Sequence, residues 1–149
     1  MPFTLLFSTR DTVFVHNRAG NVAGCYKVTL VDSSGNESPV TDSICNDNCA
    51  LIEFPNLISP NGDAFNEFFR PTCANVSVIN NAHLAIYNRW GVKVYDADRE
   101  GFYQWNAKDI ASKTNLPTGT YYYRADVEFI RLDPETVKQT FKGWIEVVR

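Results

Sequence analysis

The stretch TYYYRADVEF, residues 120–129, decides the fold of this protein. Apolar and polar side chains alternate along it without a break. Because successive side chains of a β-strand point to opposite faces, this period of two predicts a strand with one buried and one wet face. The buried face would hold Tyr121, Tyr123, Ala125, Val127 and Phe129, and the wet face Tyr122, Arg124, Asp126 and Glu128.

The neighbouring segments carry further strand patterns. In residues 138–148, KQTFKGWIEVV, the apolar positions alternate again, so the two stretches together predict a C-terminal hairpin. Residues 83–95, HLAIYNRWGVKVY, indicate two short strands broken at Arg89-Trp90-Gly91. No segment has the apolar spacing of a long helix. Many short strands separated by turn residues predict an all-β protein with an immunoglobulin-like β-sandwich.

Residues 25–45 predict a second hairpin, with a turn in DSSGNES, residues 32–38. Folding the chain at Gly35 places Cys25 opposite Cys45. Opposed residues on antiparallel strands have Cβ atoms about 4.5–5.5 Å apart, near the separation that a disulfide needs. Of the three ways to pair the four cysteines, we therefore prefer Cys25–Cys45 with Cys49–Cys73.

Composition excludes several classes of protein. An even number of cysteines without a C-x-x-C motif, in a chain rich in strand patterns, favours disulfides in an extracytoplasmic compartment over a zinc site. A net charge of −3 with no basic cluster argues against binding to nucleic acid. No apolar run approaches the ~20 residues of a membrane span, and the first residues lack the features of a signal peptide. We expect a monomer.

The segment before residues 46–50 contains about four expected strands, among them TVFVH at residues 12–16. Four strands are too few to bury both faces of a sandwich. We therefore expect residues 1–48 to be the back half of an immunoglobulin-like module whose first strands lie upstream. The alternative is that these strands extend the sheet of the following module.

No catalytic motif is present, and we predict that the protein is not an enzyme. The loop FPNLISPNGDAFNEFFRP, residues 54–71, is the one place where side-chain oxygens and a glycine suggest a calcium loop, with Asn61, Asp63 and Glu67 as ligands. The alternative is a turn in which Asn and Asp side chains bond their own backbone. We expect no cofactor, and calcium at this loop is the one candidate ion.

Aromatic residues offer another kind of site. Trp90, Trp105, Trp144 and the run Tyr121–Tyr123 could form a platform on which sugar rings stack. Strands also use aromatic residues to fill cores, and core packing is the expectation for most of these side chains. Tyr122, on the wet face of its strand, is the best candidate for an exposed ring.

Four ordered motifs together resemble the gliding motility-associated C-terminal domain, the type B sorting domain of the type IX secretion system. They are LISPNGDAFNEFF, LAIYNRWGVKVYD, LPTGTYYYRADV and KGWIEVVR, and they cover about residues 50–149. Residues 25–49 are similar to the closing hairpin of fibronectin type III-like modules. The resemblance thus implies a fibronectin type III-like segment at 1–48 and a sorting domain at 49–149. It rests on Pro60, Asn61, Gly62, Asp63, Asn88, Arg89, Trp90, Gly91, Gly119, Tyr121, Lys142, Gly143 and Arg149.

The resemblance implies a non-catalytic C-terminal module that directs a large secreted or cell-surface protein, through the periplasm, to the type IX translocon of the outer membrane. The translocon proteins would be its partners. The alternative function is a calcium- or glycan-binding adhesion module. The sequence departs from the family pattern where Ala64 replaces a glycine, where Glu67 replaces an aspartate, and where Trp105-Asn106-Ala107 replaces W-D-G, for which we expect a different turn.

Overall fold

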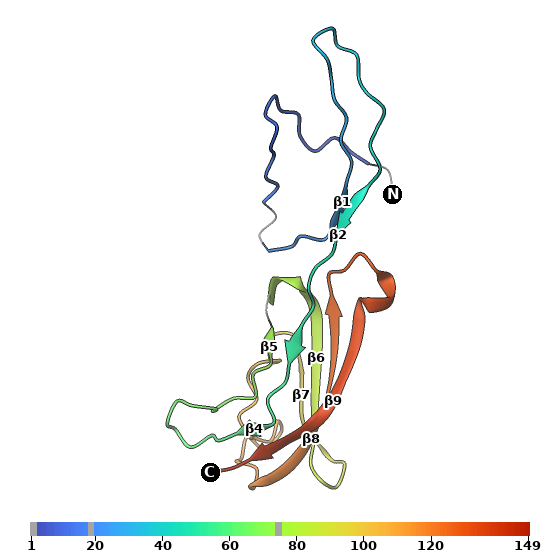
Figure 1. The fold of residues 1–149 in the computed structure, drawn as a ribbon. Coiled ribbons are helices and arrows are strands. Elements are labelled where there is room, and N and C mark those ends of the chain that lie inside the picture. The colour runs from blue at the N-terminus through green and yellow to red at the C-terminus, as the bar shows by residue number, and fades with distance from the viewer. Residues whose placement is uncertain (1–2, 18–19, 74–75) are drawn as a thin grey trace.

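The predicted C-terminal hairpin is the centre of a five-stranded sheet with the order β4-β9-β8-β6-β7 (Figure 1). β8 (Gly119–Phe129) pairs antiparallel with β9 (Lys138–Val147) on one side and with β6 (Ile79–Tyr87) on the other. β6 continues through a tight turn into β7 (Lys93–Asp98). The short strand β4 (Leu57–Ile58) runs parallel to the end of β9 and closes the other edge.

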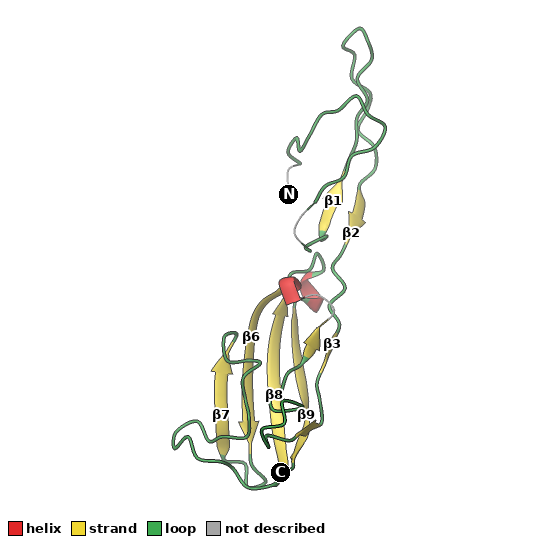
Figure 2. Ribbon diagram, turned by 90° about the vertical axis from the view of Figure 1, so that its left-hand side faces the viewer, coloured by secondary structure: helices red, strands yellow, loops and turns green. Residues whose placement is uncertain are grey.

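The computed structural model describes residues 3–17, 20–73 and 76–149. Within these residues no helix is long and apolar enough to cross a membrane. The chain is nearly all β and its layers are arranged as in a sandwich, which confirms the predicted fold class (Figure 2). The elements outside the five-stranded sheet are short. They are β1 (Gly24–Tyr26), β2 (Ile44–Asn46), β3 (Ile52–Glu53), β5 (Thr72–Cys73) and the 3-10 turns η1 (Val76–Val78) and η2 (Pro134–Thr136).

The core lies between the five-stranded sheet and a second, less regular layer. That layer consists of the antiparallel pair β3–β5, the residues that lead into β5, and the loop of residues 99–118, with a bridge between Phe69 and Trp105. Phe69, Phe102 and Trp105 are fully buried within it. The face predicted to be buried is confirmed along β8, where four of its five residues are 4% exposed or less, whereas Tyr122 on the opposite face is 51% exposed.

One close approach in the sheet requires a glycine. Gly143 on β9 lies directly opposite Tyr123 on β8. A Cβ atom at position 143 would lie 2.7 Å from the ring and the hydroxyl of Tyr123. The Tyr123 ring in turn stacks on Phe54, with ring centroids 5.0 Å apart. Gly143 therefore makes room for the ring that joins the sheet to the second layer.

The N-terminal segment is less regular than predicted. β1 pairs with β2 in the expected register, and the predicted Cys25–Cys45 disulfide is confirmed. Residues 12–16 form no strand, so the expectation of about four strands is wrong, since the structure has two in the part of 3–46 that it describes. Most of the described apolar side chains there are exposed. A fibronectin type III-like module is not confirmed.

The predicted Cys49–Cys73 disulfide is not formed in the structure. Cys49 is an exposed thiol, and Cys73 is half-buried. The register of β3 with β5 explains the difference, because it places Cys73 opposite Ile52. An extended chain advances about 3.3 Å per residue, so Cys49 lies well beyond the end of this short ladder. A disulfide needs Cα atoms within about 7 Å of each other.

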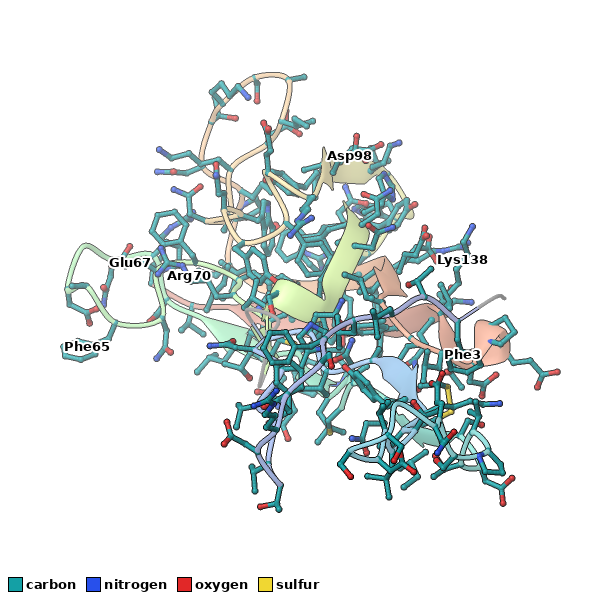
Figure 3. All side chains as sticks on the ribbon, turned by 90° about the horizontal axis from the view of Figure 1, so that it is seen from above. Phe3, Phe65, Glu67, Arg70, Asp98 and Lys138 are labelled. Atoms are coloured by element: carbon teal, nitrogen blue, oxygen red, sulfur yellow. A yellow bond between two sulfur atoms is a disulfide. The ribbon has the colours of Figure 1, made fainter. Side chains whose placement is uncertain are left out.

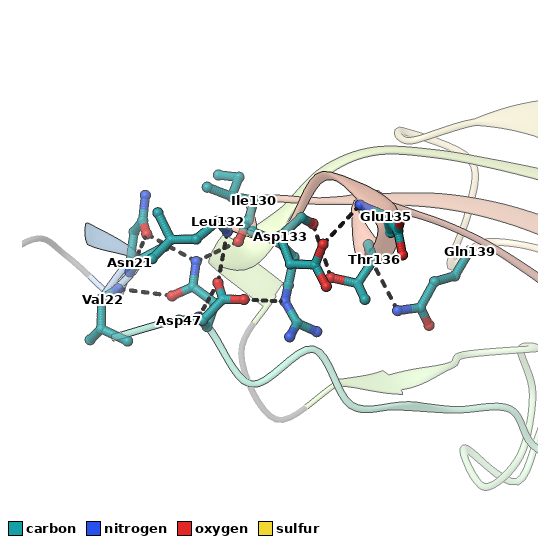
Figure 4. Close-up of polar contacts among 12 residues, drawn as sticks. Asn21, Val22, Asp47, Ile130, Leu132, Asp133, Glu135, Thr136 and Gln139 are labelled. Atoms are coloured by element: carbon teal, nitrogen blue, oxygen red, sulfur yellow. Dashed lines mark hydrogen bonds and ion pairs between the residues drawn. The ribbon is translucent and has the colours of Figure 1, made fainter. Parts of the chain in front are cut away.

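A buried asparagine connects the N-terminal segment to the sheet domain (Figure 4). Asn48 is 3% exposed. Its Oδ1 accepts a hydrogen bond from the Val22 N–H at 2.8 Å, and its Nδ2 donates to Asn21 Oδ1 at 2.9 Å and to the Ile130 carbonyl at 2.6 Å. The amide thus bonds both parts of the chain, as a buried polar group must to offset its loss of water.

Asp47 reinforces the same junction. Its carboxylate pairs with Arg131 at 2.8 Å and accepts the Leu132 N–H at 3.0 Å. Desolvation raises the pKa of Asp47, but these hydrogen bonds outweigh it and hold the pKa below its ordinary value. The segment around β1 and β2 is therefore held against residues 130–132 by two adjacent side chains.

We expect Gly143→Ala to lower the free energy of unfolding by about 1–3 kcal/mol, because the new methyl group would force the Tyr123 ring out of its packed position. Urea unfolding followed by tryptophan fluorescence measures this change. The control is the same substitution in a Tyr123→Ala background, where the methyl group meets no ring and the cost should be smaller. An equal cost in both backgrounds would contradict this account.

Candidate functional site

Most of the motif residues lie at one end of the sheet domain, away from the β1–β2 hairpin (Figure 1). The register explains this grouping. Gly119 at the start of β8 is opposite Val147 at the end of β9, and Tyr87 at the end of β6 is opposite Tyr122. β4 pairs with the same end of β9. We call the loops 59–67, 88–91 and 116–119 together with Arg149 the motif end.

Within the turn 88–91, Asn88 and Gly91 have architectural roles. Asn88 Oδ1 accepts hydrogen bonds from the N–H groups of Trp90 at 2.9 Å and Val92 at 3.0 Å. The Asn88 carbonyl accepts the Gly91 N–H at 3.0 Å, and Gly91 has a φ of 76°, which favours glycine. The turn is thus closed by one side chain and one left-handed glycine.

Trp90 has no such structural role. It is 80% exposed at the tip of the turn. Its one aromatic-face partner in the described chain is the Arg89 guanidinium, 5.9 Å from the ring centroid. Since tryptophan and arginine are the side chains most enriched at the energetic centres of protein interfaces, this pair is the best candidate for recognition of a partner.

The loop 116–119 is held by Tyr121 and Arg149. The Tyr121 hydroxyl donates to the Pro117 carbonyl at 2.8 Å, and Arg149 Nη1 donates to the Leu116 carbonyl at 2.6 Å. Burial raises the pKa of Tyr121 above its ordinary value, while the positive charges of Arg149 and Arg89 act in the opposite direction. A shallow hollow of about 110 Å³ lies between this loop and the turn 88–91.

The loop 59–67 closes on itself. The Ser59 N–H bonds the Asn66 carbonyl at 2.8 Å, and the Gly62 N–H bonds Glu67 Oε1. Asp63 accepts from the Phe65 N–H at 2.8 Å and from the Asn61 amide at 2.9 Å. These hydrogen bonds hold the pKa of Asp63 below its ordinary value.

The three predicted calcium ligands each bond the loop itself, and calcium binding stays a prediction. Asn61 Oδ1 accepts the Asp63 N–H at 3.0 Å, so each of Asn61, Asp63 and Glu67 spends a side-chain oxygen on the loop itself. In the part of the chain that the structure describes, no group of three or more His, Cys, Asp or Glu side chains is arranged to hold a metal ion. The geometry matches the alternative of a self-bonded turn.

Two alanines adopt a backbone conformation that glycine prefers. Ala64 has a φ of 71° and Ala107 a φ of 57°. Both stand where the family pattern has glycine. Ala107 is buried beside Trp105, and its left-handed backbone is one that glycine favours. The different turn that we expect after Trp105 stays a prediction. An alanine in the left-handed conformation carries strain at both positions.

Sequence reasoning missed Phe65. This side chain is 73% exposed, and in Figure 3 it points outward from the tip of the loop that also carries Glu67. The sequence feature that could have identified it is an aromatic residue inside a run of turn-forming residues, where no core position is expected. Phe65 and Trp90 thus place two exposed rings on two loops of the motif end.

Two of the motif residues lie apart from the motif end. Lys142 is exposed in the middle of β9, opposite Arg124 on β8. Gly143 lies beneath Tyr123, and its role is packing. The structure therefore groups the residues of the loops and of the C-terminus and separates these two from them.

Ala64→Gly should raise the free energy of unfolding by about 0.5–1 kcal/mol. Relief of a left-handed alanine, about 1–2 kcal/mol, is partly offset by the larger conformational entropy that glycine loses on folding. Chemical denaturation measures the change. Ala111 is the matched control, because it is exposed but lacks a positive φ, so Ala111→Gly should destabilise. A loss of stability for Ala64→Gly would show that the left-handed Ala64 is not strained.

Calcium is expected to leave the melting temperature unchanged, because the oxygens of the loop 59–67 are already engaged by hydrogen bonds. Differential scanning calorimetry in millimolar calcium and in excess chelator tests this. Magnesium at the same ionic strength controls for screening of charge. An increase in melting temperature specific to calcium, lost in Asp63→Asn, would show that the loop rearranges to bind the ion.

Comparison with known proteins identifies the family. The model of the CHU_C type IX secretion signal domain matches residues 52–147, which include the whole five-stranded sheet and the motif end up to the last strand. No curated protein matches the chain. Since the match covers more than half of the chain, the protein belongs to the CHU_C type IX secretion signal domain family.

Proposed function

We propose that residues 49–149 form a non-catalytic sorting module that directs the protein to the type IX translocon for export across the outer membrane. The match to a type IX secretion signal domain supports this proposal directly. The single structural observation that carries it is the exposure of Trp90, 80%, in a turn whose other motif residues serve the architecture.

The motif end has the physical properties of a recognition surface. Its loops are fixed by internal hydrogen bonds, so a partner would spend little conformational entropy on ordering them. Trp90 and Phe65 supply exposed rings, and Arg89 supplies a guanidinium beside one of them. A translocon protein with a complementary apolar pocket would bind these side chains as anchors.

A folded signal explains why the recognition elements are scattered along the sequence. Residues 59–67, 88–91 and 116–119 come together only after the five-stranded sheet has formed. Passage through the periplasm also agrees with the Cys25–Cys45 disulfide, because such bonds form and persist in oxidising compartments. We therefore place the exported protein outside the cell or on its surface.

Export of a reporter tests the proposal. The 149-residue chain is fused to the C-terminus of a periplasmic fluorescent protein in a host with type IX secretion, and reporter is measured in the medium and on the cell surface. We expect export of the parent fusion. Trp90→Ala should reduce export about tenfold or more, since it removes an anchor without disturbing the core.

The matched control is Trp144→Ala, which removes a half-exposed tryptophan from the sheet face outside the motif end. It should leave export unchanged. Equal melting temperatures would show that both variants are folded. Retention of the parent fusion in the periplasm, in a strain that exports an established cargo, would overturn the proposed function. Equal export by the parent and Trp90→Ala would instead remove Trp90 from the recognition surface.

A further inference from the structure

The open face of the five-stranded sheet carries an aromatic row that neither the core nor the motif end uses. Tyr87, Tyr122 and Trp144 occupy matching positions on β6, β8 and β9, because Tyr87 is opposite Tyr122 and Tyr122 is opposite Trp144. Paired residues of antiparallel strands point to the same face. Tyr122 is 51% exposed and Trp144 49% exposed, while Tyr87 is half-buried.

The row is short. Neighbouring strands lie about 4.8 Å apart, so the three side chains extend over roughly 10 Å. Along the strands the row is one residue wide, and the next side chain on the same face of a strand lies about 7 Å away. The resulting aromatic strip measures on the order of 100 Å², far below the roughly 800 Å² that each partner buries in a stable protein interface. Its size suits a small, linear ligand.

Polar side chains border the strip on both sides. On one side the Thr120 hydroxyl donates to Glu146 Oε2 at 2.8 Å. On the other side Arg124 and Lys142 are direct neighbours across β8 and β9. The Arg124 guanidinium is held by Asp126, with Nε 3.0 Å from Oδ2, whereas Lys142 forms no ion pair with any residue that the structure describes.

This arrangement matches the two-sided chemistry of a carbohydrate. A sugar ring presents apolar C–H groups on its faces, which pack on aromatic rings, and hydroxyl groups at its edge, which bond carboxylate, hydroxyl and cationic groups. The strand spacing is close to the width of one pyranose ring. We propose that the row Tyr87–Tyr122–Trp144 binds a polysaccharide chain, with Tyr122 and Trp144 stacking on successive sugar rings.

The flanking groups have distinct roles in this site. Lys142 donates hydrogen bonds to hydroxyl oxygens on one border, because its ammonium pairs with no carboxylate of residues 3–17, 20–73 and 76–149. Glu146 accepts from hydroxyl groups on the other border. The site is independent of the sorting function, since it uses the sheet face and leaves the loops of the motif end free. An exported protein could hold a surface glycan and still present Trp90 to a partner.

Affinity electrophoresis of the full 149-residue chain tests the proposal. Native gels contain hydroxyethyl cellulose, xylan, dextran or alginate as probes. We expect at least one polysaccharide to slow the protein. Tyr122→Ala and Trp144→Ala should each weaken the apparent affinity about tenfold, since each removes one stacking surface, whereas Trp144→Phe should keep most of it. Trp90→Ala, which changes an exposed tryptophan elsewhere, should bind like the parent.

A second measurement needs no variant. Oxidation of the parent by N-bromosuccinimide, read by peptide mass spectrometry, should be slowed at Trp144 by the retarding polysaccharide and remain unchanged at Trp90. Failure of all four polysaccharides to slow the parent would overturn the proposal, as would equal binding by the Tyr122→Ala/Trp144→Ala double variant. Loss of export by this double variant, without any retardation of the parent, would assign the face to a protein partner instead.

Discussion

The in-register pairing of β8 with β9 is the constraint on which the rest of the structure depends. It places Gly143 beneath Tyr123, so one face can accept the aromatic layer that fills the core. It also places Gly119 beside Val147, which brings the loop 116–119 to the C-terminus. A slip of one residue would send every buried side chain of β9 to the solvent. The core and the motif end therefore both depend on the register of β8 with β9.

The motif residues divide into those that support the loops of the motif end and those that a partner could contact. Asn88, Gly91, Tyr121 and Arg149 satisfy backbone groups or supply special conformations. Trp90 does neither. Its ring remains in contact with water, which costs free energy that burial in a core would avoid. The proposed recognition would need the folded state, because the fixed framework and the exposed side chains come from distant parts of the chain.

Sequence reasoning succeeded where local pattern and tertiary structure agree. The alternation of residues 120–129 predicted the burial of β8, and the turn at Gly35 predicted the pairing of Cys25 with Cys45. It failed at Cys49–Cys73 and at residues 12–16. Those segments are short, and strands of a few residues form only where neighbouring layers pack on them. Such packing is a property of the whole fold and leaves little trace in a local pattern.

The sequence by itself determined the strand periods, the turn residues and the motifs that identify the family, because these depend on side chains a few positions apart. Only the tertiary structure decided that loops 59–67, 88–91 and 116–119 meet at one end, and that Tyr122 and Trp144 lie side by side on the open face. The physical reason is register. Which residues of two strands face each other depends on the packing of the entire sheet, and no single strand specifies it.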